Sequence, residues 1–267
     1  MIIQAPHIFN RADDAYREWL AAIYYTGNEV SPRGQRTLEL QHLSAAFALD
    51  RPVIRNPVRK VNFKFMAAEP LWYLSGSDDV EDIAQYNSQL RAFSDDGSTF
   101  FGAYGPRINQ QLPYVLNKLQ ADPATRQAAM TLWRPNPPET RDVPCTVALT
   151  FEIRHGKLNC HVFMRSSDAW LGVPYDWFSF SVIAAFVASA IKVPLGTLYF
   201  TAASAHLYAR DIDSAREAMR WSLNDRALEE GEPLSPLTAA GNWGDIYHSL
   251  VSCRGGAFDA HVKWRIR

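Results

Sequence analysis

The sequence Arg165-Ser-Ser-Asp-Ala-Trp-Leu-Gly-Val-Pro-Tyr-Asp176 leads directly into an uncharged run from Trp177 to Ile191. The run is apolar on nearly all sides of a helix, which is typical of a helix buried at the centre of a domain. The polar side chains before it stand at the end of a β-rich segment, where they are costly to bury unless they bind something. The stretch therefore predicts a central helix with a binding site at its beginning.

Segments on both sides of this stretch are rich in β-forming residues. Thr146 to Arg154 and Leu158 to Arg165 are joined by His155-Gly156-Lys157, which predicts a hairpin. Further strands are predicted at Thr37 to Leu49, Gln127 to Arg134 and Leu198 to Ala203. Helices are predicted at Phe9 to Tyr25 (capped by Asn10 or Asp13), Asn62 to Leu74, and Asp211 to Leu223. The predicted fold class is α+β, with a large mixed or mainly antiparallel sheet and a buried central helix.

The length and composition indicate one globular unit. The chain has 267 residues, 47% of them hydrophobic and 21% charged, and no repeat or Gly/Ser linker divides it. We therefore expect a single domain over residues 1–267. The 27 Lys and Arg residues are balanced by 28 Asp and Glu residues, so no overall field attracts nucleic acid or an anionic membrane.

The cellular location follows from the apolar run and the cysteines. Trp177 to Ile191 is shorter than the roughly 20 residues that a membrane span needs, and the first residues show no targeting pattern. Three cysteines without a Cys-x-x-Cys pair disfavour both a disulfide framework and a zinc ribbon. We expect a cytoplasmic protein with no metal site, no membrane partner and no nucleic-acid partner.

Several common motifs are absent from the sequence. It contains no Gly-x-Gly-x-x-Gly, no Gly-Lys-Ser/Thr loop and no His-Glu-x-x-His, which removes the main support for dinucleotide, nucleoside-triphosphate and zinc-protease sites. What remains is Cys145, placed by a proline-bearing loop at the start of a strand. A lone cysteine there is ordinarily a small buried apolar residue.

Cys145 does not stand alone, however. Together with Val143-Pro-Cys145 and Ala205-His-Leu-Tyr208, the run from Arg165 to Asp176 resembles the thymidylate synthase family. The resemblance extends from Ser31 to about Tyr208, and its Arg-Ser-x-Asp-x-x-Leu-Gly-x-Pro pattern is highly specific. It implies a pyrimidine nucleoside monophosphate substrate, 5,10-methylenetetrahydrofolate as the co-substrate, no metal, and a homodimer with a shared active site.

The resemblance also implies three catalytic roles. Cys145 matches the nucleophile that adds to C6 of the pyrimidine, where a thiolate is both a strong nucleophile and an adequate leaving group. We expect nearby arginines to lower its pKa. Glu69 matches the carboxylate that organises water for proton transfers, and Tyr104 matches a tyrosine involved in removing the C5 proton.

Binding roles are implied in the same way. The matching substrate positions are Arg33, Arg165 and Ser166 for the phosphate, Arg126 for the partner subunit's site, and His206 and Tyr208 for the sugar 3′-hydroxyl. The matching folate positions are Asp168, Leu171, Gly172, Tyr175, Leu90 and Phe93. Two details depart from the family pattern: the glycines near Arg33 differ, and Gln127 stands where a second arginine is usual, which weakens one phosphate contact.

Asp176 is the departure that bears on the base. Thymidylate synthases usually have Asn here, whose amide pairs with uracil, whereas phage-type deoxycytidylate hydroxymethylases have Asp. A carboxylate can accept a hydrogen bond from cytosine N4 and support a proton at N3, but it would face uracil O4 with a second acceptor. A mismatched buried acceptor costs about 1 to 3 kcal/mol or more, which favours cytosine.

Leu90-Arg-Ala-Phe93 is the second departure. Synthases usually carry two tryptophans here, and one of them helps to shield the reaction intermediate from water. Their absence makes access of water easier, which favours a hydroxymethyl product over a methyl product.

The sequence therefore predicts a cytidine monophosphate C5-hydroxymethyltransferase, with dCMP preferred. Three alternatives stay open. They are a CMP hydroxymethylase of nucleoside-antibiotic biosynthesis, a thymidylate synthase-type dUMP methylase, and a catalytically silent paralogue that binds nucleotide or RNA. A silent paralogue is disfavoured because Cys145, Glu69, Arg165 and Asp168 are all present. The near-neutral net charge also lacks the excess of positive charge that is typical of RNA-binding proteins.

Overall fold

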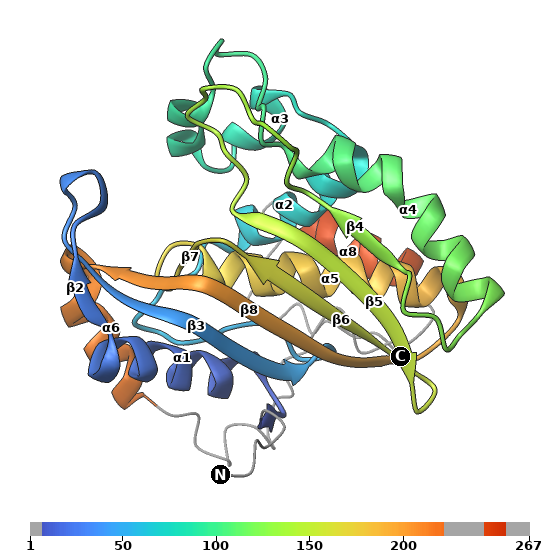
Figure 1. The fold of residues 1–267 in the computed structure, drawn as a ribbon, viewed down its shortest axis with the longest axis horizontal. Coiled ribbons are helices and arrows are strands. Elements are labelled where there is room, and N and C mark those ends of the chain that lie inside the picture. The colour runs from blue at the N-terminus through green and yellow to red at the C-terminus, as the bar shows by residue number, and fades with distance from the viewer. Residues whose placement is uncertain (1–6, 222–242, 255–267) are drawn as a thin grey trace.

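The computed structural model describes residues 7–221 and 243–254 (Figure 1). Its centre is a mixed sheet in which eight strands are described, with the order β1-β3-β8-β6-β5-β4; in addition, β2 pairs with β3 and β7 with β8. The strands are β1 (Ile8–Phe9), β2 (Asn28–Val30), β3 (Thr37–Ala48), β4 (Ala129–Thr131), β5 (Thr146–Arg154), β6 (Lys157–Met164), β7 (Ser167–Asp168) and β8 (Leu195–Tyr208). The predicted α+β class with a mixed sheet is confirmed.

The pairing of the strands explains where their ends meet. β5 and β6 form the predicted antiparallel hairpin, and its turn residues His155 and Gly156 have φ of 51° and 72°. Two consecutive positive φ values are the geometry of a tight hairpin turn, which glycine adopts without strain. β6 and β7 both run parallel to β8, whereas β3 runs antiparallel to β8. The polar residues after β6 therefore lie beside the end of β8.

Two predicted strands differ in length from the observed ones. β8 extends to Tyr208, five residues beyond the predicted end, because its last residues pair with β3 and β7. β4 is only three residues long, whereas a strand from Gln127 to Arg134 is predicted, because only Ala129 to Thr131 pair with β5.

The predicted central helix is confirmed as α5 (Val173–Ile191), most of which is buried. It begins four residues earlier than predicted, with Gly172 at the N-cap. At 19 residues it has the length and composition to span a membrane, but 67% of its most apolar 18-residue window is buried within the fold. Its Trp177 contacts aromatic rings from α1 (Ala12–Thr26), β3 and β8, so α1 and α5 cover the same face of the sheet.

The remaining helices form two groups. α2 (Phe63–Ser75), α3 (Val80–Ala84), α4 (Tyr104–Ala121) and α8 (Trp243–Arg254) lie together beside α5, whereas α6 (Ile212–Arg220) packs on α1 (Figure 1). α2 begins after the cap Asn62 and ends at Gly76, as predicted. The predicted helix from Asp211 is confirmed over Ile212–Arg220 but ends earlier than predicted, with Trp221 as its C-cap; Leu223 lies outside the described residues. The predicted cap of α1 is wrong, because Arg11 is the N-cap and Asp13 lies in the first turn, where it accepts a hydrogen bond from the Arg55 amide.

Candidate active site

Cys145 and Arg165 stand at the two open ends of the β5–β6 hairpin. Cys145 immediately precedes β5 and Arg165 immediately follows β6, and the Arg165 N–H donates to the Cys145 carbonyl at 2.9 Å. The Arg165 guanidinium donates to the Pro144 and Val143 carbonyls at 2.8 and 2.9 Å, and its Nη2 lies 3.7 Å from the Cys145 Sγ. The backbone of the cysteine loop therefore holds a positive charge beside the thiol.

The pKa of Cys145 nevertheless lies above the ordinary value. Burial of the thiol is the largest cause; Arg165 and Arg33 lower the pKa, while the charges of Asp176 and Asp142 raise it. The expected lowering by nearby arginines is confirmed, but desolvation of the thiolate outweighs the guanidinium charges. The arginines limit the increase and do not reverse it.

Tyr104 is held close to this thiol by Thr146, the first residue of β5. The phenol oxygen accepts a hydrogen bond from the Thr146 N–H at 3.1 Å and lies 3.0 Å from the Thr146 Oγ1. Burial raises the pKa of Tyr104 far above its usual range, and the charges of Cys145 and Asp176 raise it further. The phenol therefore stays protonated and is a hydrogen-bonding group at neutral pH.

Glu69 lies on α2 and faces α5. The Ser179 hydroxyl donates to its Oε2 at 2.7 Å. Burial raises the pKa of Glu69 to about 7, although the hydrogen bonds from Ser179 and Tyr73 lower it. A carboxyl group that titrates near neutrality can both accept and return a proton, as the predicted role requires.

Asp176 lies in the first turn of α5, close to the N-cap Gly172. A side chain at Gly172 would place its Cβ 3.1 Å from the Asp176 Oδ2, so the absence of a Cβ makes room for this carboxyl. Burial raises the pKa of Asp176 well above the ordinary value, and the charges of Glu69 and Asp168 add to this. Because α5 begins at Val173, Asp176 is not its N-cap, and a purely capping role does not explain it.

The residues predicted to bind the sugar lie at the end of β8. The ring centroids of His206 and Tyr208 are 5.3 Å apart, and β7 pairs Asp168 directly with His206. Burial lowers the pKa of His206, against the charge of Asp168. Ser166 is half-buried between β6 and β7. These strands thus bring the predicted sugar residues beside the predicted folate residue Asp168.

The two other predicted phosphate arginines are placed differently. Arg33 is exposed in a turn between β2 and β3, where its φ is 54°, and its charge reaches Cys145 and His206. Arg126 is exposed ahead of β4, at the edge of the sheet, and among the described residues no hydrogen bond or ion pair links it to the site. Within one chain, Arg33 therefore belongs to the group around Cys145, and Arg126 does not.

Four of the predicted folate residues lie at or just before the start of α5: Asp168, Leu171, Gly172 and Tyr175. Asp168 caps this turn by accepting from the Trp170 and Leu171 amides, both at 2.8 Å. Leu90 and Tyr175 both pack against the cluster around Phe65. Leu171 is 45% exposed and Phe93 is 49% exposed, although both are large and apolar. An apolar surface beside a hydrogen-bonding carboxylate fits a flat, partly polar ring such as a pterin.

Several contributing residues were not predicted. Arg59 is buried, with its guanidinium carbon 5.4 Å from the ring centroids of both Trp170 and Tyr175. Ser179 donates a hydrogen bond to Glu69, Tyr73 lowers the pKa of Glu69, and Thr146 donates a hydrogen bond to Tyr104. Helical spacing could have indicated Tyr73, four residues after Glu69. No sequence pattern could have indicated Arg59, because only the tertiary fold brings it against Trp170 and Tyr175.

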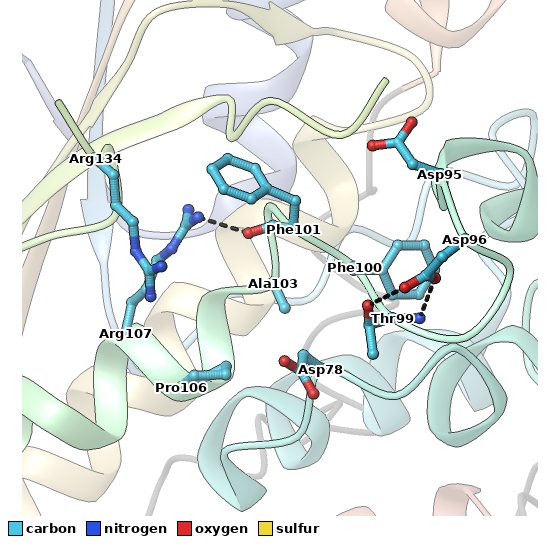
Figure 2. Close-up of a pocket in the computed structure, with 10 residues that line it drawn as sticks. All are labelled: Asp78, Asp95, Asp96, Thr99, Phe100, Phe101, Ala103, Pro106, Arg107 and Arg134. Atoms are coloured by element: carbon cyan, nitrogen blue, oxygen red, sulfur yellow. Dashed lines mark hydrogen bonds between the residues drawn. The ribbon is translucent and has the colours of Figure 1, made fainter. Parts of the chain in front are cut away.

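A cavity of about 340 Å³ lies next to the loop that leads into Tyr104 (Figure 2). Arg107 lines it and donates to the Phe101 and Leu132 carbonyls, both at 2.6 Å. Asp142 accepts from the Gly102 N–H at 2.6 Å. The cavity is lined by Asp78, Asp95, Asp96, Thr99, Phe100, Phe101, Ala103, Pro106, Arg107 and Arg134, none of which is a predicted ligand of the nucleotide or the folate. The structure thus uses Arg107 and Asp142 to fix the loop that positions Tyr104.

In residues 7–221 and 243–254, no three His, Cys, Asp or Glu side chains form a group that could hold a metal ion.

Comparison with known proteins agrees with this arrangement. Residues 14–227 match the family model described as thymidylate synthase. Over 226 residues the chain is 32% identical to the deoxyuridylate hydroxymethyltransferase of Bacillus phage SP01, covering 73% of this chain and 57% of the phage protein. Over 160 residues it is 32% identical to the deoxyuridylate hydroxymethyltransferase of Pseudomonas phage M6, covering 56% of this chain and 46% of that protein. The matched regions thus span only about half the length of these relatives.

The family match covers the sheet from β2 to β8, the central helix and every residue placed around Cys145. The chain therefore belongs to the thymidylate synthase family.

Proposed function

We propose that this protein transfers a hydroxymethyl group from 5,10-methylenetetrahydrofolate to C5 of a pyrimidine deoxyribonucleoside monophosphate, with dCMP as the preferred substrate. The observation that carries the proposal is the electrostatic linkage of Cys145, Tyr104, Asp176 and Glu69, which come from three helices and the loop before β5. A nucleophile, two acid–base groups and a base-reading carboxyl in one buried site match this reaction.

Four residues of the candidate active site have defined tasks in the proposed reaction. The Cys145 thiolate adds to C6, and Arg165 stabilises both the thiolate and the nucleotide phosphate. The bound folate supplies the one-carbon unit. Tyr104 stays protonated, so it positions a water that removes the C5 proton, and Glu69 accepts and returns protons at the base.

The proposed hydroxymethyl product is supported by the surface around Leu90 and Phe93. Phe93 is 49% exposed, so much of its ring is open to water. Both phage relatives are named hydroxymethyltransferases. A methyl product would require hydride transfer from the folate and exclusion of water, for which this open surface is less suited.

The preference for cytosine is proposed from Asp176. Its carboxylate would accept from N4 and support a proton at N3 as the ring becomes a covalent adduct. The positive N3 in turn offsets the cost of ionising a buried carboxyl.

A second candidate substrate, dUMP, is favoured by a specific observation. Burial and two neighbouring carboxyls raise the pKa of Asp176, which favours its neutral form. A neutral carboxyl could accept from uracil N3–H and donate to O4. Both phage relatives are named deoxyuridylate hydroxymethyltransferases. The choice between the two bases therefore depends on the proton of Asp176.

We also propose a homodimer with shared sites. On the face of the sheet opposite α1 and α5, Val147 and Phe163 are 36% and 42% exposed, although neither lies on an edge strand. A second copy packed on this face would cover them, and it would give Arg126 a partner site to enter.

The test is a parallel assay with dCMP, CMP and dUMP labelled with tritium at C5. We expect tritium release with dCMP above the other two, a product heavier by one hydroxymethyl group, and tetrahydrofolate as the second product. Dihydrofolate that accumulates with turnover would identify a methylase. Release that is highest with CMP would identify a ribonucleotide enzyme, and no release with any nucleotide would identify a silent paralogue.

A further inference from the structure

Tyr73 is a buried tyrosine to which the proposed reaction has so far given no task. It follows Glu69 by four residues on α2, so the two side chains share one face of the helix. Tyr73 is 6% exposed, and its hydroxyl acts on the Glu69 carboxyl, whose pKa it lowers. Its ring lies 5.0 Å from that of Tyr104, inclined by 37°.

The titratable groups whose charges act on Tyr73 belong to the candidate active site. Glu69 faces it from its own helix, Tyr104 from α4 and Asp176 from α5. Ser179, also on α5, donates to the Oε2 of Glu69 at 2.7 Å. A phenylalanine would fill the same volume without the cost of burying a hydroxyl, so the hydroxyl needs a reason to be there.

We propose that Tyr73 is a positioning residue that orients the Glu69 carboxylate to take the proton from the water that forms the hydroxymethyl group. The inference rests on the proposed function and adds a residue to it. With donors from α2 and α5, the carboxylate would be held in one orientation, and its second oxygen would have a fixed place for the water.

The step balances without an oxidant or a reductant. The water oxygen bonds to the exocyclic methylene carbon on C5 of the nucleotide, and the water proton passes to Glu69. The methylene π pair enters the ring, then re-forms the C5–C6 double bond as the C6–S bond breaks. The sulfur pair returns to Cys145 as thiolate.

The hydrogen bond also keeps Glu69 available as a base. Donation to the ionised form lowers the pKa of Glu69, which burial alone would raise above about 7. Loss of the hydroxyl should therefore raise this pKa and free the carboxylate to rotate.

The experiment compares Tyr73→Phe with Tyr24→Phe, a control that removes the hydroxyl of a half-buried tyrosine on α1. Tritium release from C5 reports the steps before water adds, and hydroxymethyl product reports the step after. We expect the wild type and the control to form one product per tritium released. Tyr73→Phe should release tritium within about threefold of wild type but form product about 10-fold or more slowly, with the methylene captured by an added thiol.

Two further readouts separate a positioning role from a structural one. On the acidic side of the pH profile, the pH at which the rate of product formation is half-maximal should be about one unit higher in Tyr73→Phe. In protein without folate or nucleotide, the infrared carbonyl band of protonated Glu69, assigned with Glu69→Gln, should persist to higher pH. Tyr73→Leu, whose smaller side chain relaxes the ring contact, should show the same infrared shift if Tyr73→Phe does not fold.

The outcomes distinguish this inference from the proposed function. No tritium release by the wild type contradicts the proposed function, while the infrared titration still tests the bond between Tyr73 and Glu69. Coupled product and tritium in Tyr73→Phe, with an unchanged Glu69 titration, would overturn the role of Tyr73.

Discussion

The Nη2 of Arg165 lies 3.7 Å from the Sγ of Cys145, although the whole β5–β6 hairpin separates the two residues in sequence. Antiparallel pairing brings the ends of the hairpin together, and carbonyls of the cysteine loop hold the guanidinium in place. The same guanidinium is proposed to bind the nucleotide phosphate. Thiol reactivity and substrate binding are therefore coupled through one charge.

Removing the charge of Arg165 should raise the pKa of Cys145 further. In Arg165→Gln, the pH at which alkylation by iodoacetamide is half-maximal should rise by roughly one unit above that of the wild type, because the thiolate loses its nearest cation. Cys160 and Cys253 are buried, so alkylation of the folded protein reports Cys145. Cys145→Ala should take up no label, and an unchanged midpoint in Arg165→Gln would contradict the coupling.

Cys145→Ser should fold normally but lose turnover by several orders of magnitude. The side chains are similar in size, whereas a serine alkoxide does not form at neutral pH as a thiolate does. Thermal unfolding checks the fold, and tritium release from the labelled nucleotide checks the chemistry. Release near the wild-type rate would rule out the covalent mechanism.

Asp176→Asn should lose activity on dCMP and gain activity on dUMP. The amide can pair with uracil N3–H and O4, but it lacks the anion that supports a protonated cytosine N3. The relative specificity should change by about 2 to 4 kcal/mol, or roughly 30- to 1000-fold. Specificity constants for both nucleotides on both proteins provide the measurement. An unchanged ratio would remove the reason for proposing cytosine.

Arg126→Ala and Cys145→Ala should each be inactive alone and should recover activity when mixed. If Arg126 completes the site of the partner subunit, one of the two sites in a mixed dimer contains both intact residues. Subunit exchange is verified with differently tagged chains before activity is measured. Continued inactivity of verified mixed dimers would place Arg126 outside the shared site.

Glu69 should make folding stability fall as pH rises. Its pKa in the folded protein is about 7, against an ordinary value of 4.5, so between these pH values the unfolded chain releases the proton while the folded one keeps it. This contribution is complete below about pH 4.5 and is lost as pH rises through 7, by about 3 kcal/mol. Denaturant unfolding at several pH values should show this loss for the wild type relative to Glu69→Gln. A constant difference between the two proteins would show that folding does not raise the pKa of Glu69.

The elements that could be predicted are those whose pattern is local. The central helix is apolar along its whole length, and the hairpin turn at Gly156 has its own chemistry, so both follow from neighbouring residues. The start of α5 could not be located in this way. It begins at Val173, because Gly172 and Pro174 allow a turn capped by Asp168, and this places Asp176 inside the helix.

The sequence by itself determined the class of fold, the family and the chemical identity of the groups around Cys145, because these depend on residue types at fixed spacings along the chain. Only the tertiary structure decided how those groups behave. Burial raises the pKa of Cys145 above its ordinary value despite Arg165. Burial also raises the pKa of Glu69 to about 7, although Ser179 and Tyr73 lower it. Desolvation and hydrogen bonding depend on which segments pack together, and residues distant in sequence set them only after the chain has folded.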